Sequence, residues 1–216
     1  KWSGLLLELE SQNLLERYRW IFEDSHVNIV EVDKLHLDWK DAFERIRIYK
    51  HNAITEIEQS HGFEGVCQFA KMVKCPNEVG ESYACSANDD TYRRVLNILL
   101  HDKHEAIINF TKGVFSHYTF RNGINSIIPI LGSLDFDKYK EVFVIPITVM
   151  PCACREMWDF IDILPKAIQN EYWANITVGF IYEDESVFLI KRLIEYKRYD
   201  KALAIISHSH NKTIIP

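Results

Sequence analysis

The chain has 216 residues, and its balance of 47% hydrophobic and 26% charged residues is typical of a globular protein with a real core. It contains only 8 glycines and 6 prolines, which is few for an all-β protein that needs a turn every ~8–12 residues. The formal net charge of −6 argues against a nonspecific nucleic-acid binder, because such proteins need a basic stripe that displaces counterions.

Uncharged runs and cysteines bear on the compartment. Residues 122–134 and 142–154 are the longest uncharged runs, at 13 residues each, whereas a membrane span needs ~18–20, so we expect no membrane insertion. The five cysteines are odd in number and irregularly spaced, which favours reduced thiols and a cytoplasmic location. The chain starts with Lys1, and we expect it to be a fragment of a longer protein.

Hydrophobic periodicity predicts helices from the beginning of the chain. A first helix is expected over residues 4–24, followed by an extended connector over 25–38. The longest periodic segment is 37–60. Its apolar stripe is interrupted by Lys50, so we expect the stripe to pass through Tyr49 and Ile57 instead. Gly62 suits the position just after the end of this helix.

Turn residues divide the next part of the chain. Further helices are expected over residues 63–73, 76–86, 92–100 and 106–118. Pro76 suits a first helical turn, Asn88-Asp89-Asp90 offers cap residues, and Asn122-Gly123 is a strong turn signal.

The region 124–165 is the least regular, since Pro129, Pro146 and Pro151 interrupt it. Residues 142–149 are rich in β-branched side chains, so a buried strand is an alternative there. We favour helices, because no other segment offers a clear strand partner. Helices over 151–164 and 165–176 follow, and then a helix pair over 184–208 with a polar break at 197–200.

Three segments of the chain align with one another. Each has a small residue, a branched aliphatic one position later and a large apolar residue four positions after the small one: Gly65, Val66 and Phe69; Ala106, Ile107 and Phe110; Ala202, Leu203 and Ile206. A small residue lets two helices approach closely. The small residues lie 41 and 96 residues apart, and the second distance is twice 48, so a further unit is expected in the irregular middle. These distances suit a period of ~40–47.

This pattern predicts an all-α fold, an α-solenoid of stacked antiparallel helix pairs that is irregular in the middle. An irregular helical bundle is the alternative. We expect one helical-repeat domain over residues 1–216, with a possible internal boundary near 120–135.

A family resemblance rests on the last part of the chain. Residues 189–206 resemble the junction between the helices of a tetratricopeptide-like unit, and Tyr199-Asp200-Lys201-Ala202-Leu203 is similar to the start of its second helix. With Leu164-Pro165 and Tyr172-Trp173, the segment resembles HEAT-like or tetratricopeptide-like regions of large bacterial multidomain proteins. Some of those proteins carry a signalling NTPase, and some are linked to phage defence. No phosphate-binding loop motif occurs here, so the resemblance implies that an NTPase would lie outside this sequence.

Residues able to carry chemistry are scattered. His101 and His104 straddle a predicted turn without a third metal ligand, and His208 and His210 lie near the C-terminal end. Cys152-x-Cys154 is too tight for a zinc knuckle, so core thiols are the better interpretation. A Cys–His catalytic pair stays open without a local signature. We therefore predict no catalytic, cofactor-binding or metal residues, and no cofactor.

Charged and aromatic clusters also have structural interpretations. Two acidic clusters fall where helix N-termini are predicted: Asp89-Asp90 and Glu183-Asp184-Glu185. The positive end of the helix dipole favours carboxylates at these positions. The basic group Lys191, Arg192, Lys197 and Arg198 is interpreted as a solvated helix face. Tyr172-Trp173, followed by Phe180 and Tyr182, is interpreted as core, with a concave binding groove as the alternative.

The function expected from the sequence is a non-catalytic helical-repeat scaffold that binds a protein or peptide, or other domains of its own chain, and binds neither nucleic acid nor membrane. The alternative is a sensor or regulatory helical domain of a larger signalling NTPase or other enzyme.

Overall fold

The computed structural model describes residues 13–24, 39–133, 135–140, 142–148, 155–176 and 183–208. Every regular element in these ranges is helical, which confirms the all-α prediction. The chain divides into two compact units, Lys1–His117 and Tyr118–Pro216. None of the helices in the described ranges is long and apolar enough to cross a membrane.

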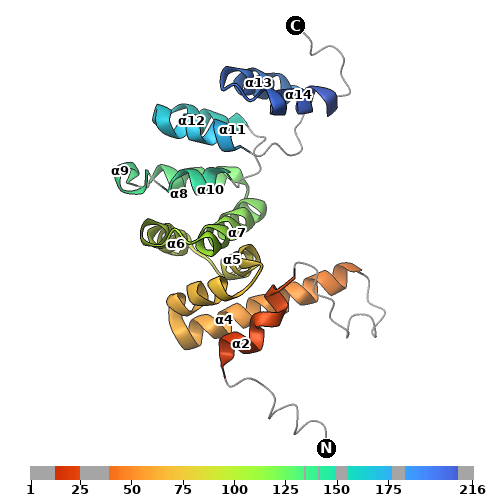
Figure 1. Cartoon of the computed structure of the whole chain (residues 1–216), viewed down its shortest axis with the longest axis vertical. Helices are drawn as coiled ribbons and strands as arrows, with labels where there is room; N and C mark the ends of the chain where they lie inside the picture. Colours follow the sequence, from red (N-terminus) through yellow and green to blue (C-terminus); the bar gives the residue numbers. More distant parts are fainter. Residues whose placement is uncertain are drawn as a thin grey trace, which may run out of the picture. The chain divides into compact units, whose positions relative to one another are not determined.

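The first unit contains α2 (Leu14–Arg19), the 3-10 helix η1 (Trp20–Phe22), α4 (Trp39–Met72), α5 (Pro76–Ala84), α6 (Asp89–His101) and most of α7 (Glu105–Asn122). The second unit contains the end of α7, then α8 (Ile124–Gly132), α9 (Phe136–Tyr139), α10 (Val144–Thr148), α11 (Arg155–Asp162), α12 (Lys166–Asn175), α13 (Glu183–Glu195) and α14 (Tyr199–His208) (Figure 1).

Local sequence signals set most of the helix ends, as predicted. Gly62 has a φ of 69° and divides α4 into two helical parts. Pro76 lies in the first turn of α5, and Asn88 forms a capping box with Thr91 at the start of α6. Gly123, with a φ of 77°, separates α7 from α8.

Two expectations about element boundaries have different outcomes. The predicted helix over 4–24 is not continuous, because Asn13 is extended and its side chain accepts a hydrogen bond from the Leu15 amide, which caps α2. The part of that prediction over residues 4–12 lies outside the described residues. The preference for helix over strand at 142–149 is confirmed for the described residues 142–148, which form a turn and α10. The predicted connector over 25–38 lies outside the described residues.

The core of the first unit forms where α2 and η1 pack against α4 and α5 (Figure 1). The rings of Phe22 and Phe69 meet edge to face at 5.3 Å, and both side chains are fully buried. Farther along, the Phe110 ring of α7 lies 5.8 Å from Tyr83 of α5. Aromatic contacts therefore join η1 to α4 and α5 to α7 in this unit.

The predicted apolar stripe of α4 is wrong near Lys50. Tyr49 is 45% exposed, whereas Lys50 is only 7% exposed. The reason lies in distant parts of the chain: the Lys50 ammonium pairs with Glu78 of α5 and lies 5.4 Å from the centre of the Phe22 ring. A buried cation needs such partners, and a short-range pattern does not reveal them.

The aligned segments have different environments. The aliphatic and large apolar positions of the first two are fully buried: Val66, Phe69, Ile107 and Phe110. In the third segment the small residue Ala202 is buried, but the aliphatic Leu203 is 64% exposed. The third segment therefore does not share the burial pattern of the first two.

Candidate functional site

Helix α13 is attached to α11 and α12 through side chains spaced four residues apart. The Phe188 ring stacks on Trp158 of α11 at 5.2 Å, and the Tyr196 ring, just after α13, stacks on Trp173 of α12 at 5.6 Å. Between them, Arg192 pairs with Asp162 at the end of α11. Spacing of this kind places all three side chains on one side of the helix.

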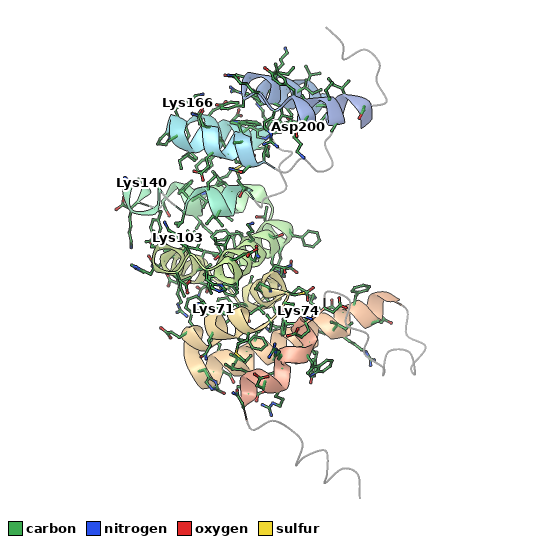
Figure 2. All side chains as sticks on the ribbon, in the orientation of Figure 1. Lys71, Lys74, Lys103, Lys140, Lys166 and Asp200 are labelled. Atoms are coloured by element: carbon green, nitrogen blue, oxygen red, sulfur yellow. The ribbon has the colours of Figure 1, made fainter. Side chains whose placement is uncertain are left out.

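Cations surround the rings of this contact. The guanidinium carbon of Arg155 lies 3.9 Å from the centre of the Phe188 ring, and that of Arg192 lies 5.2 Å from it. Lys166 of α12, labelled in Figure 2, bonds the Tyr196 hydroxyl at 2.7 Å. Cation–π contacts of this kind contribute about 0.5–1 kcal/mol each at exposed sites.

The connection between α13 and α14 has a defined geometry. The Arg198 amide donates to the Leu193 carbonyl at 2.7 Å, and the Lys197 amide donates to the Ile194 carbonyl at 3.0 Å. These two bonds form a Schellman motif, with Lys197 in the left-handed region at a φ of 60°. The predicted break at 197–200 is confirmed for Lys197 and Arg198, whereas Tyr199 and Asp200 already belong to α14.

Arg198 also fixes this turn to the end of α12. Its guanidinium donates to the carbonyls of Trp173, at 3.1 Å, and Ala174. Carbonyls in the last turn of a helix have no partner within the helix, and a cation there also matches the helix dipole. The α13–α14 pair is therefore anchored to α12 at two places.

Four large apolar side chains of the α13–α14 pair are exposed. Val187 and Ile194 on α13 are 42% and 47% exposed, and Tyr199 and Leu203 on α14 are 55% and 64% exposed. We call these four side chains the α13–α14 face. Large apolar side chains that gather on a protein surface commonly mark interaction sites.

The predicted features of the sequence are separated in the structure. His101 and His104 are both exposed at the α6–α7 turn, as expected, and His104 Nδ1 accepts from the Ala106 amide at 3.1 Å. Within the described part of the chain, no three His, Cys, Asp or Glu side chains are grouped to hold a metal. Cys152, Cys154 and His210 lie outside the described residues.

The predictions for the aromatic, acidic and basic clusters are confirmed in part. Tyr172 and Trp173 are fully buried, which confirms the core interpretation, while Phe180 and Tyr182 lie outside the described residues. Asp89-Asp90 and Glu183-Asp184-Glu185 do begin α6 and α13. The solvated-face interpretation of the basic group holds for Lys191 and Lys197, which are exposed, and is wrong for Arg192 and Arg198, which bind neighbouring helices.

The exposure of the four residues of the α13–α14 face has no signal in the sequence, because helical periodicity does not distinguish covered from uncovered apolar residues. Comparisons with protein-family models, curated proteins and solved structures found no match.

Proposed function

We propose that this chain is a helical-repeat scaffold that binds a protein or peptide through the α13–α14 face. The observation that carries the proposal is the exposure of Val187, Ile194, Tyr199 and Leu203 on two helices that are otherwise fixed to their neighbours. A rigid apolar surface gives affinity at a low cost in conformational entropy.

The proposed solenoid arrangement is supported by contacts in the second unit. α11 packs on α12, α13 packs on α14, and the rings of Phe188 and Tyr196 join one pair to the other. Successive helix pairs that each contact their neighbours are what a solenoid requires. In such a fold, the outer side of a pair is available to a partner or to further repeats.

The chemistry of the α13–α14 face suits a protein partner. Tyr199 offers a large ring with a polar hydroxyl, the kind of side chain that often anchors interfaces. The charged residues Lys191, Glu195 and Asp200 are exposed on the same two helices and would supply a polar rim. An apolar centre with charges around it is typical of a protein interface.

Site-specific crosslinking tests this proposal. A photoreactive amino acid at Val187 should yield one defined crosslinked protein in cells that contain the natural partner. The substitution Leu203→Asp should remove that product, because a carboxylate in the apolar centre is costly to desolvate. Ile163→Asp is the matched control, since Ile163 is 79% exposed in the turn after α11 and lies outside the face.

Equal crosslinking in both aspartate variants would contradict the proposal. Because Leu203 is largely exposed, Leu203→Asp should leave the thermal unfolding temperature almost unchanged, so lost binding would not reflect lost folding.

A further inference from the structure

A histidine and a serine from distant parts of the sequence meet where α5 ends. His51 lies on α4, and its Nδ1 is 3.0 Å from the carbonyl oxygen of Ser82. On the other side of the ring, its Nε2 is 3.3 Å from the Ser86 hydroxyl. The imidazole is thus held between a backbone carbonyl and a hydroxyl.

These contacts define the roles of the ring atoms. A carbonyl oxygen can only accept a hydrogen bond, so Nδ1 of His51 carries the hydrogen. In a neutral imidazole the other nitrogen then has a lone pair, and it accepts from the Ser86 hydroxyl. A hydroxyl, a base within reach of it and a third group that orients the base are the parts of an activated nucleophile.

The surroundings leave the hydroxyl open to a reagent. Ser86 is exposed, while His51 is half-buried. The His51 ring is therefore held in place beside a hydroxyl that a reagent can reach from solvent.

We propose that Ser86 is a nucleophilic acceptor for activated acyl groups, with His51 as its general base. The Ser86 oxygen would attack the acyl carbonyl carbon, and Nε2 of His51 would take the hydroxyl proton. The bond between the acyl carbon and its leaving group would break, and the leaving group would depart with the electron pair. The product is an ester on Ser86 and one released anion.

The backbone suggests stoichiometric acylation rather than rapid turnover. The amides of Ser86 and Ala87 already donate to the carbonyls of Tyr83 and Ala84, at 3.5 and 3.1 Å. They are therefore not free to form the pair of donors that stabilises a tetrahedral intermediate in efficient hydrolases. This inference is independent of the α13–α14 face.

Acetylation by p-nitrophenyl acetate, with peptide mapping by mass spectrometry, tests it. Cys85 is replaced by alanine in every sample, so that its thiol does not compete for the reagent. Ser86 should be acetylated on the order of 10²-fold faster than Ser207, an exposed serine whose hydroxyl donates to the Ala204 carbonyl. His51→Gln should lower the Ser86 rate to that of Ser207.

Either of two results would overturn the proposal: equal acetylation of Ser86 and Ser207, or an unchanged Ser86 rate in His51→Gln. Far-ultraviolet circular dichroism of His51→Gln checks that the helices remain. A second variant, Ser86→Ala, must remove the acetyl group from this peptide while leaving His51 in place.

Discussion

Gly80 of α5 and Gly113 of α7 form a reciprocal close contact between two helix backbones. A Cβ atom on Gly80 would collide with the Phe110 carbonyl oxygen and would lie 2.9 Å from the Val114 amide nitrogen. A Cβ atom on Gly113 would collide with the Asn77 carbonyl oxygen. Gly80 therefore faces the turn of α7 that contains Gly113, and Gly113 faces the first turn of α5. The two helix backbones are closer here than they could be with a side chain between them.

Replacing either glycine by alanine should destabilise the first unit. The obstructing atoms belong to the backbone and cannot rotate away, so the helices would have to move apart. We expect Gly80→Ala or Gly113→Ala to lower the free energy of unfolding by about 1–3 kcal/mol, as measured by urea denaturation.

Gly132 at the end of α8 is the matched control. Among the described residues, a Cβ atom there would meet the Phe160 ring alone, at 3.9 Å, which is an ordinary contact. Gly132→Ala should leave stability unchanged or raise it by up to ~1 kcal/mol. Equal losses for all three variants would show that the close contact between α5 and α7 is unimportant.

The Lys50–Glu78 pair should be costly to break. The two side chains are only 8% and 15% exposed, so Glu78→Gln would leave a buried cation without its counter-charge. We expect a loss of about 3–5 kcal/mol in urea unfolding. Lys50→Met combined with Glu78→Leu should recover most of it, because the pair is then removed together.

The exposed Arg47–Glu44 pair is the control for that experiment. Its side chains are 55% and 52% exposed, so Glu44→Gln should change stability by no more than ~0.5 kcal/mol. A similar loss for Glu44→Gln and Glu78→Gln would contradict the role of burial.

Thiol labelling should distinguish Cys67 from Cys85. Burial raises the pKa of the Cys67 thiol to about 12, so roughly one thiol in ten thousand is ionised at pH 8. Cys85 is only half-buried. Iodoacetamide should therefore modify Cys85 first and Cys67 only when the first unit opens, as followed by mass spectrometry. The two should react alike in denaturant, and faster native labelling of Cys67 would contradict the structure.

Lys197→Gly should stabilise the α13–α14 turn. Lys197 adopts a φ of 60°, which costs a residue with a Cβ atom roughly 1–2 kcal/mol, whereas glycine adopts it freely. Glycine also makes the unfolded chain more flexible, so the net gain should be on the order of 0.5 kcal/mol. Urea unfolding measures it. Lys191→Gly, inside α13, should instead destabilise by ~1 kcal/mol.

Asp102 should make the free energy of unfolding depend on pH in the acid range. A hydrogen bond from Lys71, at 2.5 Å, holds the pKa of Asp102 below its ordinary value (Figure 2 labels Lys71). Because the folded pKa is lower than the unfolded one, the unfolded state binds more protons as the pH falls. This contribution is present above pH ~4 and is lost as the pH falls through the folded pKa of Asp102.

The substitution Asp102→Asn should remove that part of the acid dependence. The measurement is urea unfolding between pH 3 and pH 6. Asp159→Asn is the control, since Asp159 pairs with Arg155 on the surface of α11, where its side chain is 60% exposed. A variant Asp102→Asn with an unchanged pH profile would show that the Lys71 contact is absent in solution.

The sequence could predict the helices because helix limits depend on nearby residues. Gly62, Pro76, Asn88 and Gly123 act through their own dihedral angles or through bonds within one turn. The same holds for the break at Lys197 that shapes the α13–α14 pair. The four residues of the α13–α14 face could not be predicted, because a helical period alone does not say which apolar residues find a partner.

Local chemistry in the sequence thus determined that the chain is helical and where most of its helices begin and end. Only the tertiary structure decided that Lys50 is buried and Leu203 exposed, that Gly80 meets Gly113, and that His51 reaches Ser86. The physical reason is that burial and close approach depend on which helices pack together. The residues that contact one another in this way lie tens of positions apart in the sequence, whereas turn and cap residues act only on the nearest turn of the chain.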